Sequence, residues 1–161
     1  MSTISGGNVT SLTGEVLAHE VTYTETAGAG TYTGSVTIPG NSWLLDLKFI
    51  NTALWDNAGT AVLKAGDATT DNGWFTGINL KATDLIAGTN QETLDFNNAG
   101  GKPGGFIVAA TGERARMYVA TERLATGIVT TSSTGGTAGR LRMMALYTSP
   151  INVVEATKVA S

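Results

Sequence analysis

The sequence contains one histidine, His19, and no cysteine, and this limits the acid–base and nucleophilic chemistry that the chain could perform. Glu20 follows His19, but neighbouring residues of a strand point to opposite faces, so the two side chains cannot form an acid–base pair locally. No serine lies in a G-x-S-x-G motif, which excludes the nucleophile elbow of hydrolases. We therefore predict no catalytic residue and no cofactor, and we expect His19 to lie in or beside the core.

The loop at 66–73, G-D-A-T-T-D-N-G, is rich in the oxygen-bearing side chains that bind Ca²⁺. An EF-hand loop that began at Asp67 would need glycine at its sixth position and glutamate at its twelfth, where this chain has Asn72 and Ile78. The EF-hand is therefore excluded, and we assign no metal site. Asp67 and Asp71 remain the candidates for a looser calcium site, and the alternative is a solvated turn.

A second loop, G-G-K-P-G-G at 100–105, lacks the G-x-x-x-x-G-K-[ST] spacing of a phosphate-binding loop. Pro103 also has no N–H at a point where such a loop needs a donor. We expect this segment to be a long hairpin tip, or a loop that contacts another part of the protein.

Two pairs of arginines, Arg114 with Arg116 and Arg140 with Arg142, are each two residues apart in extended segments. The members of a pair therefore share one face of a strand. Such a pair is typical of a solvated or edge-protecting surface. The alternative is a contact with an acidic patch of a partner, and Arg140 and Arg142 are our candidates for that contact.

The three tryptophans allow a hypothesis of sugar binding. We expect Trp43 to belong to the core, and Trp55 and Trp74 to lie at junctions between strands and turns. Buried packing is the expected role of both. If Trp55 and Trp74 were instead exposed and coplanar, they would form a platform for sugar rings, as in a carbohydrate-binding module.

The elements that would position these side chains are strands. The central pattern lies in residues 36–65, where Trp43, Leu45, Leu47 and Phe49 recur at period 2 and are therefore expected on one face. A face of two aromatic and two leucine side chains needs a second sheet to cover it. We interpret this stretch as the central strand of a β-sandwich.

Other strands follow the same alternation. Leu17, His19, Val21 and Tyr23 are expected on one face of a strand over 16–24. The next strand, over 31–38, alternates Tyr32, Gly34, Val36 and Ile38 with threonine and serine, and the A-G-A-G turn between the two strands favours an antiparallel hairpin. Further strands are expected at 61–65, 93–96, 106–110, 117–122, 126–131 and 141–148, with a short helix between Leu80 and Gly88. About eight strands with at most one short helix predict an all-β, antiparallel β-sandwich or jelly roll.

Composition bounds the classes of partner. The net charge is −3 and only 14% of residues are charged, so the chain lacks the basic surface of a nucleic-acid-binding protein. The first residues have neither the basic nor the apolar region of a signal peptide. The apolar runs are far shorter than a membrane span, so we predict no membrane partner.

We divide the 161 residues into three parts. Residues 1–14 are polar and rich in serine, threonine and glycine, and we expect a flexible N-terminal arm. The arm is either a frayed terminus or a segment that becomes ordered against a partner subunit. The apolar residues of this arm, Ile4, Val9 and Leu12, are candidate partner contacts. Residues 15–149 form the β-sandwich domain, and residues 150–161 form a C-terminal tail.

Three stretches carry a resemblance to a known class of protein: I-P-G-N-S-W-L-L-D-L-K-F from position 38, A-G-D-A-T-T-D-N-G-W-F-T-G-I-N-L-K-A-T-D-L from position 65, and G-I-V-T-T-S-S-T-G-G-T-A-G-R-L-R-M-M-A-L-Y from position 127. The chain resembles small virion structural proteins of tailed bacteriophages. Within that group it is most similar to β-sandwich or jelly-roll capsid decoration (cement) proteins. These are motifs of a fold, so no functional residue is transferred by position.

The resemblance implies a homo-oligomer, often a trimer, bound to the major capsid protein on the outside of an expanded capsid. It also implies assembly in the cytoplasm of the infected cell. The function expected is therefore non-enzymatic stabilisation of the assembled shell. The alternatives are a component of a tail or head fibre and a carbohydrate-binding adhesion module.

Overall fold

The computed structural model describes residues 15–81, 93–96, 103–108 and 117–148. These residues form nine strands and one four-residue helix. In chain order they are β1 (Val16–Thr24), β2 (Gly30–Ile38), β3 (Ser42–Ala53), β4 (Ala61–Gly66), β5 (Phe75–Asn79), β6 (Thr93–Leu94), α1 (Gly105–Val108), β7 (Met117–Val119), β8 (Arg123–Thr131) and β9 (Arg140–Thr148).

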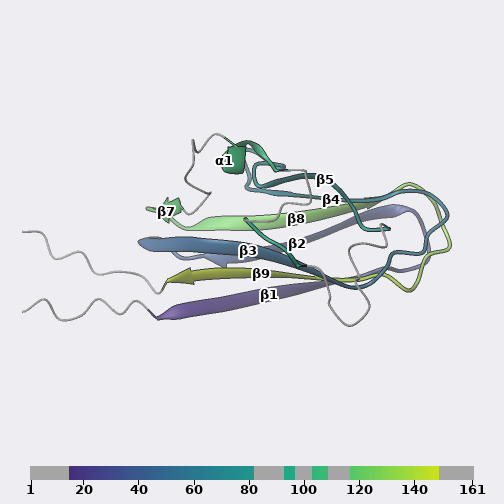
Figure 1. Ribbon diagram of the computed structural model, residues 1–161, viewed down its shortest axis with the longest axis horizontal. Helices are drawn as coiled ribbons and strands as arrows, with labels where there is room; N and C mark the ends of the chain where they lie inside the picture. Colours follow the sequence, from purple (N-terminus) through teal and green to yellow (C-terminus); the bar gives the residue numbers. More distant parts are fainter. Residues whose placement is uncertain (1–14, 82–92, 97–102, 109–116, 149–161) are drawn as a thin grey trace, which may run out of the picture.

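The strands form two antiparallel sheets that lie one above the other (Figure 1). Sheet A has the order β1-β9-β3-β6, and β7 also pairs with β3; sheet B has the order β2-β8-β4-β5. Along the chain, β1 to β4 alternate between the two sheets, and β8 and β9 again lie in different sheets. A five-strand layer and a four-strand layer connected in this way form a jelly roll. The predicted all-β sandwich or jelly roll is confirmed.

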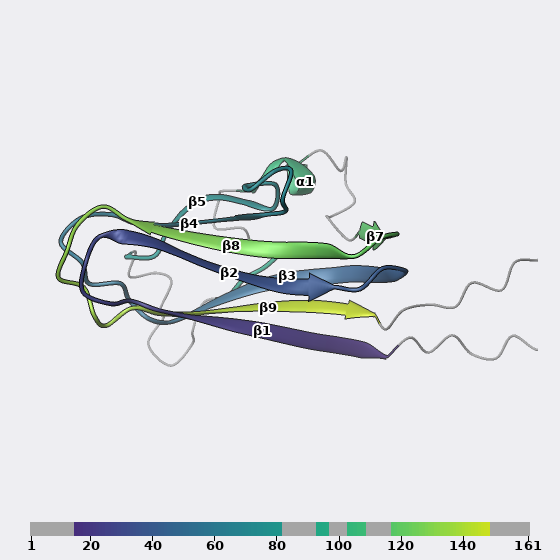
Figure 2. The same cartoon turned by 180° about the vertical axis from the view of Figure 1, so that it is seen from behind.

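The sandwich has two different ends. At one end β1 begins at Val16 and β9 finishes at Thr148, which are register partners; we call this the terminal end. At the other end the loops 25–29, 54–60 and 132–139 pass from one sheet to the other, and we call this the tip. Figure 2 shows the tip loops on the left and the terminal end on the right.

The predicted hairpin of the first two strands is wrong. β1 pairs with β9 in sheet A, whereas β2 pairs with β8 in sheet B, and the turn between β1 and β2 crosses from one sheet to the other. Glu25 explains the crossing, because its N–H donates to the carbonyl oxygen of Gly139 at 2.9 Å and ties the turn to the β8–β9 loop. Alternation predicted the faces of both strands correctly, since it does not depend on which strand is the partner.

The prediction that Trp43, Leu45, Leu47 and Phe49 share one face of β3 is correct only for the last two. The register with β9 shifts between Leu44 and Asp46, which is a β-bulge. One extra residue reverses the phase of alternation, so Leu44, Leu47 and Phe49 are buried while Trp43 points outward with 42% of its surface exposed.

The strand predicted at 106–110 is also wrong where it can be compared. Residues 105–108 form the short helix α1, and the rest of that segment lies outside the described residues, as does most of the helix predicted between Leu80 and Gly88. The contacts of Gly104, the residue before α1, explain why the chain turns here. The N–H of Gly104 donates to the carbonyl oxygen of Trp74 at 2.7 Å, and a Cβ at Gly104 would lie 2.2 Å from the carbonyl oxygen of Asn72. Gly104 therefore lies directly against the β4–β5 loop. This agrees with the second of the two predictions for the glycine-rich segment, a loop that contacts another part of the protein.

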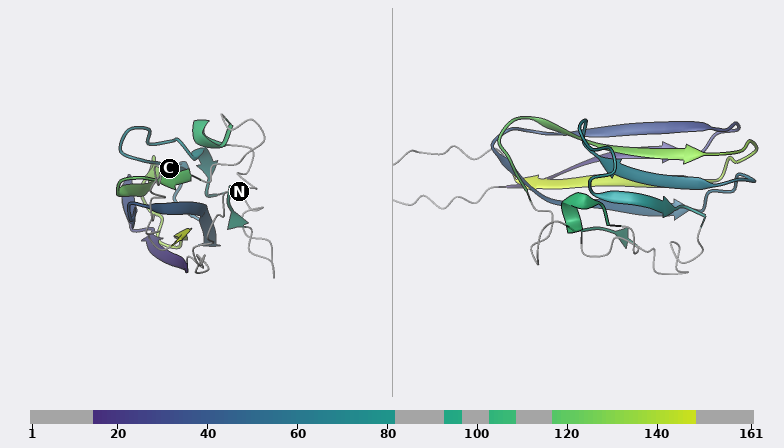
Figure 3. Two further views of the ribbon diagram at one scale, coloured as in Figure 1. Left: turned by 90° about the vertical axis from the view of Figure 1, so that its left-hand side faces the viewer. Right: turned by 90° about the horizontal axis from the view of Figure 1, so that it is seen from above.

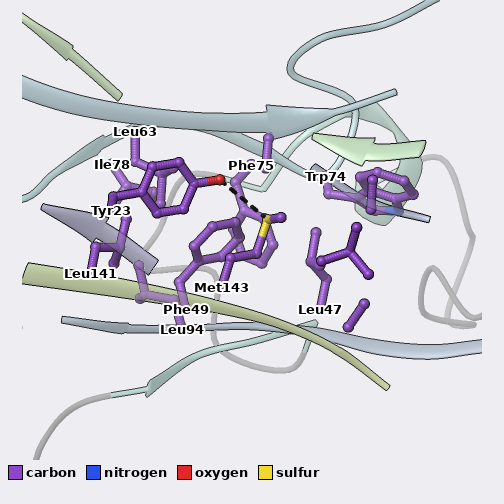
Figure 4. Close-up of a cluster of buried hydrophobic side chains, with 14 of the residues drawn as sticks. Tyr23, Leu47, Phe49, Leu63, Trp74, Phe75, Ile78, Leu94, Leu141 and Met143 are labelled. Atoms are coloured by element: carbon purple, nitrogen blue, oxygen red, sulfur yellow. Dashed lines mark hydrogen bonds between the residues drawn. The ribbon is translucent and has the colours of Figure 1, made fainter. Parts of the chain in front are cut away.

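The core lies between the inner faces of the two sheets. Figure 4 shows aromatic, aliphatic and methionine side chains from both sheets meeting in this layer. Phe49 of sheet A contacts Phe75 of sheet B with ring centroids 5.3 Å apart in an edge-to-face arrangement. On β9 every second residue is fully buried, which follows directly from strand alternation. These β9 residues are Leu141, Met143, Ala145 and Tyr147.

Tyr23 of β1 connects the two sheets through a pair of hydrogen-bond acceptors. Its hydroxyl group lies 3.0 Å from the carbonyl oxygen of Gly34 on β2 and 3.1 Å from that of Gly127 on β8, and its donor can also point to the sulfur of Met143 (Figure 4). Gly34 and Gly127 are register partners, so two residues without a side chain make room for the hydroxyl group. Burial raises the pKa of Tyr23 well above its usual value, so the phenol remains a hydrogen-bond donor at neutral pH.

We expect Y23F to lower the free energy of unfolding by about 1–2 kcal/mol, because it removes buried hydrogen bonds while the ring remains. Gly127→Ala should also destabilise the fold, since its Cβ would lie 2.5 Å from the Tyr23 hydroxyl oxygen. Urea unfolding of both single variants and the double variant measures these terms. The double variant should lose less stability than the sum, because Y23F removes the atom that the added Cβ would meet. Strict additivity would show that the hydroxyl group does not constrain Gly127.

Candidate interaction surfaces

The structure removes the basis of the sugar-binding platform. Trp55 and Trp74 are 1% and 0% exposed. Trp55 contacts Tyr32 edge to face at a centroid distance of 5.1 Å, and Trp74 contacts Phe106 in the same way at 5.4 Å. Both tryptophans therefore pack inside the protein, as expected, and neither can stack on a ligand.

His19 and Glu20 point to opposite sides of sheet A, as their adjacency in a strand predicts. The His19 ring lies edge to face against Tyr147 at 5.5 Å, and the Tyr147 hydroxyl group lies 3.2 Å from Nδ1. Glu20 forms an ion pair with Arg142 on the outer face. His19 thus lies beside the core with a buried tyrosine as its neighbour.

The two calcium candidates have different protein partners. Oδ1 of Asp67 accepts the N–H groups of Thr69 and Thr70 at 2.9 and 2.8 Å, and Oδ2 lies 3.4 Å from Nη1 of Arg123. Asp71 pairs with Lys64 instead. Within the residues that the structure describes, three or more histidine or carboxylate side chains nowhere gather as metal ligands. The carboxyl groups of the two aspartates stabilise the turn and its neighbouring strands.

Arg140 and Arg142 share the outer face of β9, as predicted, but both guanidinium groups already have partners in the chain. Nη1 of Arg140 donates to the carbonyl oxygens of Thr137, Ala138 and Gly139 at 2.8–3.2 Å. Arg142 pairs with Glu20, and this carboxylate raises the pKa of the Arg142 guanidinium. A partner would have to share or replace these contacts.

The other predicted contacts lie elsewhere. Ile4, Val9 and Leu12 are outside the described residues, and so are Arg114 and Arg116. No helix in the described ranges is long and apolar enough to cross a bilayer.

A group of carboxylates at the tip was not predicted from the sequence. Glu25 is 2% exposed, and its carboxylate accepts the N–H groups of Asp56 and Gly139 at 3.0 Å and that of Asn57 at 3.2 Å. Asp56 in turn accepts the N–H groups of Thr137 and Ala138 at 2.8 and 3.0 Å. The two side chains hold all three tip loops together. Apart from the Asp56 carboxyl group, which forms a hydrogen bond with Glu25, the groups that face Glu25 are backbone donors, so we interpret this group of carboxylates as structural.

An exposed aromatic pair at the terminal end was also not predicted from the sequence. Trp43 of β3 and Tyr118 of β7 are register partners, each 42% exposed, with ring centroids 5.6 Å apart. The Tyr118 hydroxyl group donates to Oδ1 of Asn41 at 2.9 Å, which orients the ring. The bulge in β3 turned Trp43 outward, and no periodic pattern of the sequence shows a bulge.

All large hydrophobic side chains that are exposed in the described residues lie at this end. Besides the aromatic pair, they are Val16 at the start of β1 and Leu124 near the start of β8. Leu124 lines an open cleft of about 390 Å³ together with Glu122, Arg123 and the loop 67–69. The terminal end therefore presents apolar side chains from both sheets, with charged side chains beside Leu124.

No protein-family model matches the sequence, and no curated protein matches it significantly. Among solved structures, a chain of the cyanophage Pam1 capsid asymmetric unit aligns with a TM-score of 0.50 and 16% sequence identity, over 84% of each chain. The fold is that of a phage capsid chain. The predicted resemblance to phage structural proteins is thus confirmed at the level of the fold.

A chain of the acidic stable capsid structure of Helicobacter pylori bacteriophage KHP30 also aligns, with a TM-score of 0.46 and 13% identity over 87% of this chain and 100% of that chain. We draw no inference from this second alignment, because its TM-score is lower than 0.5.

The carboxylates of the tip predict how stability depends on pH. The N–H groups of Ala138 and Thr137 hold the pKa of the Asp56 carboxyl below its usual value of 3.8. A carboxyl group whose pKa is lower in the folded than in the unfolded state stabilises the protein at any pH above its unfolded-state pKa. This stabilisation is lost as the pH falls through the folded-state pKa. The stability difference between wild type and D56N should therefore be constant above about pH 5 and shrink in more acidic solution.

Urea midpoints of the two proteins between pH 3 and pH 7 measure this difference. D56N suits this test because the asparagine amide oxygen can still accept hydrogen bonds from the loop while the negative charge is removed. A difference that stays the same down to pH 3 would show that the charge on Asp56 contributes nothing to the tip.

Proposed function

We propose that this protein is a non-enzymatic structural component of a bacteriophage capsid that binds the assembled shell and stabilises it, as a decoration or cement protein does. One observation carries the proposal: the jelly roll aligns with a chain of a phage capsid asymmetric unit over 84% of both chains. Equal shares mean that the two aligned chains have similar lengths, so the likeness extends over most of each chain.

The partner that we propose is the major capsid protein on the exterior of the shell, together with further copies of this chain, for which a trimer is our expectation. A protein that binds the assembled shell better than its separated subunits stabilises the assembly by mass action. Each contact can be weak, because an oligomer binds several shell subunits at once.

We assign the shell contact to the terminal end. Its exposed aromatic pair resembles the anchors of protein interfaces, in which tryptophan and tyrosine contribute most of the binding energy. The tip is a poorer candidate, since its carboxylates and loop amides already satisfy one another. Residues 1–14 precede β1, which begins at this same end, and we propose Ile4, Val9 and Leu12 as further contacts with the shell.

The variants Trp43→Ala and Tyr118→Ala test the aromatic anchor. Each should weaken binding to purified capsids by about tenfold or more, because each removes a large apolar contact. Co-sedimentation of the protein with capsids, over a range of protein concentrations, gives the affinity. Ala27→Ser is the matched control, since Ala27 is exposed at the opposite end, in the loop between β1 and β2. Equal binding by all three variants would exclude the terminal end as the contact.

Deletion of residues 1–14 tests the arm separately. The truncated protein should retain its thermal midpoint within a few degrees, because the jelly roll begins at Val16, and should bind capsids more weakly. Calorimetry and co-sedimentation provide the two measurements. A truncated protein that decorates capsids as well as the full chain would show that the arm makes no contact.

A further inference from the structure

One side of the jelly roll has two long open edges. Among the described residues, no strand pairs with the outer edge of β1 or of β2, each of which has nine residues (Figure 2). The opposite side is different, because sheet A ends there in β6 and β7, of two and three residues, and sheet B ends in β5, of five (Figure 3). Short strands protect an edge from pairing with another chain, and the long edges lack this protection.

β2 also lacks the other protective features. Its sequence, G-T-Y-T-G-S-V-T-I, contains no charged residue and no proline, and its register with β8 is continuous over all nine pairs without a bulge. Lysine, proline and bulges are the usual means by which proteins prevent edge-to-edge association. An uncharged and regular edge of this length is therefore suited to accept another strand.

The contact of Tyr23 shows which groups of β2 face the open edge. One hydroxyl group reaches the carbonyl oxygens of both Gly34 and Gly127, so both oxygens must lie between β2 and β8. Gly34 therefore points its backbone groups toward β8, and antiparallel alternation points those of the next residues outward. The N–H and C=O groups that face the open edge belong to Thr31, Thr33, Ser35 and Thr37.

We propose that β2 is a self-association site and that its partner is β2 of a second copy, which runs antiparallel to it with Gly34 on the two-fold axis. In this register Thr33 lies opposite Ser35 of the partner subunit and Thr31 opposite Thr37 of the partner subunit. On the inner face, Tyr32 lies opposite Val36 of the partner subunit. Threonine–serine and aromatic–β-branched pairs are favourable cross-strand pairs, so the sequence of β2 is complementary to itself.

The same side of the sandwich supports a second copy as the occupant. Leu17, Val21 and Tyr32 pack against the core but are only partly buried. Tyr32 belongs to β2, and Leu17 and Val21 to the neighbouring open strand β1, so a partner along β2 would cover apolar surface that one copy leaves accessible. β1 is less suitable for self-pairing, because an antiparallel pair centred on Glu20 would place two carboxylates opposite each other.

The test compares T33K with T130K. Thr33 and Thr130 are both exposed on the outer face of sheet B, but β8, which carries Thr130, has a neighbour on each side. In the proposed dimer the two lysine side chains introduced by T33K are diagonal neighbours and repel each other. T33K should therefore raise the dimer dissociation constant about tenfold or more, while T130K should leave it unchanged. Light scattering after size exclusion, at several protein concentrations, measures the masses.

The expected result is a wild-type mass of two chains, or of six chains if β2 pairs join two of the expected trimers, and T33K alone should lower this mass to one chain or to three. A wild-type mass of one chain or of three chains at all concentrations overturns the proposal. A mass that T33K does not change overturns it as well. This experiment uses no capsids, so it is independent of the proposed function.

Cysteine variants test the register. The chain has no cysteine, so T33C and S35C each introduce a single thiol. An equal mixture of the two should form disulfide-linked dimers on mild oxidation, because positions 33 and 35 face each other across the axis at a distance that a disulfide can span. Each variant alone should cross-link much less. Equal cross-linking in the mixture and in the separate variants would overturn the register.

Discussion

The hydroxyl group of Tyr23 is the contact on which the arrangement of the two sheets depends. It belongs to an edge strand of sheet A and reaches two carbonyl oxygens of sheet B, so it links the two sheets by a polar contact inside the core. The contact requires glycine at two positions that are adjacent across β2 and β8. A neutral, buried hydroxyl group suits this place, because its single proton has carbonyl oxygens on both strands to donate to.

The two ends of the molecule differ in two respects: the carboxylates at the tip are hydrogen-bonded within the chain, whereas aromatic side chains at the terminal end are exposed. At the tip, Glu25 and Asp56 accept backbone N–H groups from loops that would otherwise be independent. At the terminal end, Trp43 and Tyr118 contact each other and remain largely accessible. A rigid body with one self-contained end and one end that presents aromatic side chains suits a protein whose role is to be held in an assembly.

The edges of the sheets add a second asymmetry. Short strands close one side of the jelly roll, whereas the other side leaves nine-residue edges free of any strand among the described residues. β1 carries Glu20, whose partner Arg142 lies on the same chain, and β2 carries no charge. Natural proteins rarely leave an uncharged edge of this length without a function, since association along it is otherwise uncontrolled.

Much of the fold followed from the sequence alone. Alternation predicted the buried faces of β1, β2 and β9, because the side-chain period of a strand is a local property that survives any choice of partner. The same is true of the buried roles of Trp55 and Trp74 and of the opposite directions of His19 and Glu20. The absence of cysteine and the unsuitable surroundings of the only histidine were likewise properties of the sequence.

The tertiary structure decided the rest, because it depends on contacts between distant residues. β1 could pair with β2 through a short turn, or with β9 in a sheet whose inner face is buried against the other sheet. The second arrangement depends on the apolar surface buried between the sheets, which the local sequence pattern does not show. The exposed Trp43 depends on a bulge against β9, and the buried Glu25 depends on amides that lie more than a hundred residues away at Gly139. Sequence therefore determined which side chains share a face, and the packing of the two sheets determined which faces, edges and ends remain open to a partner.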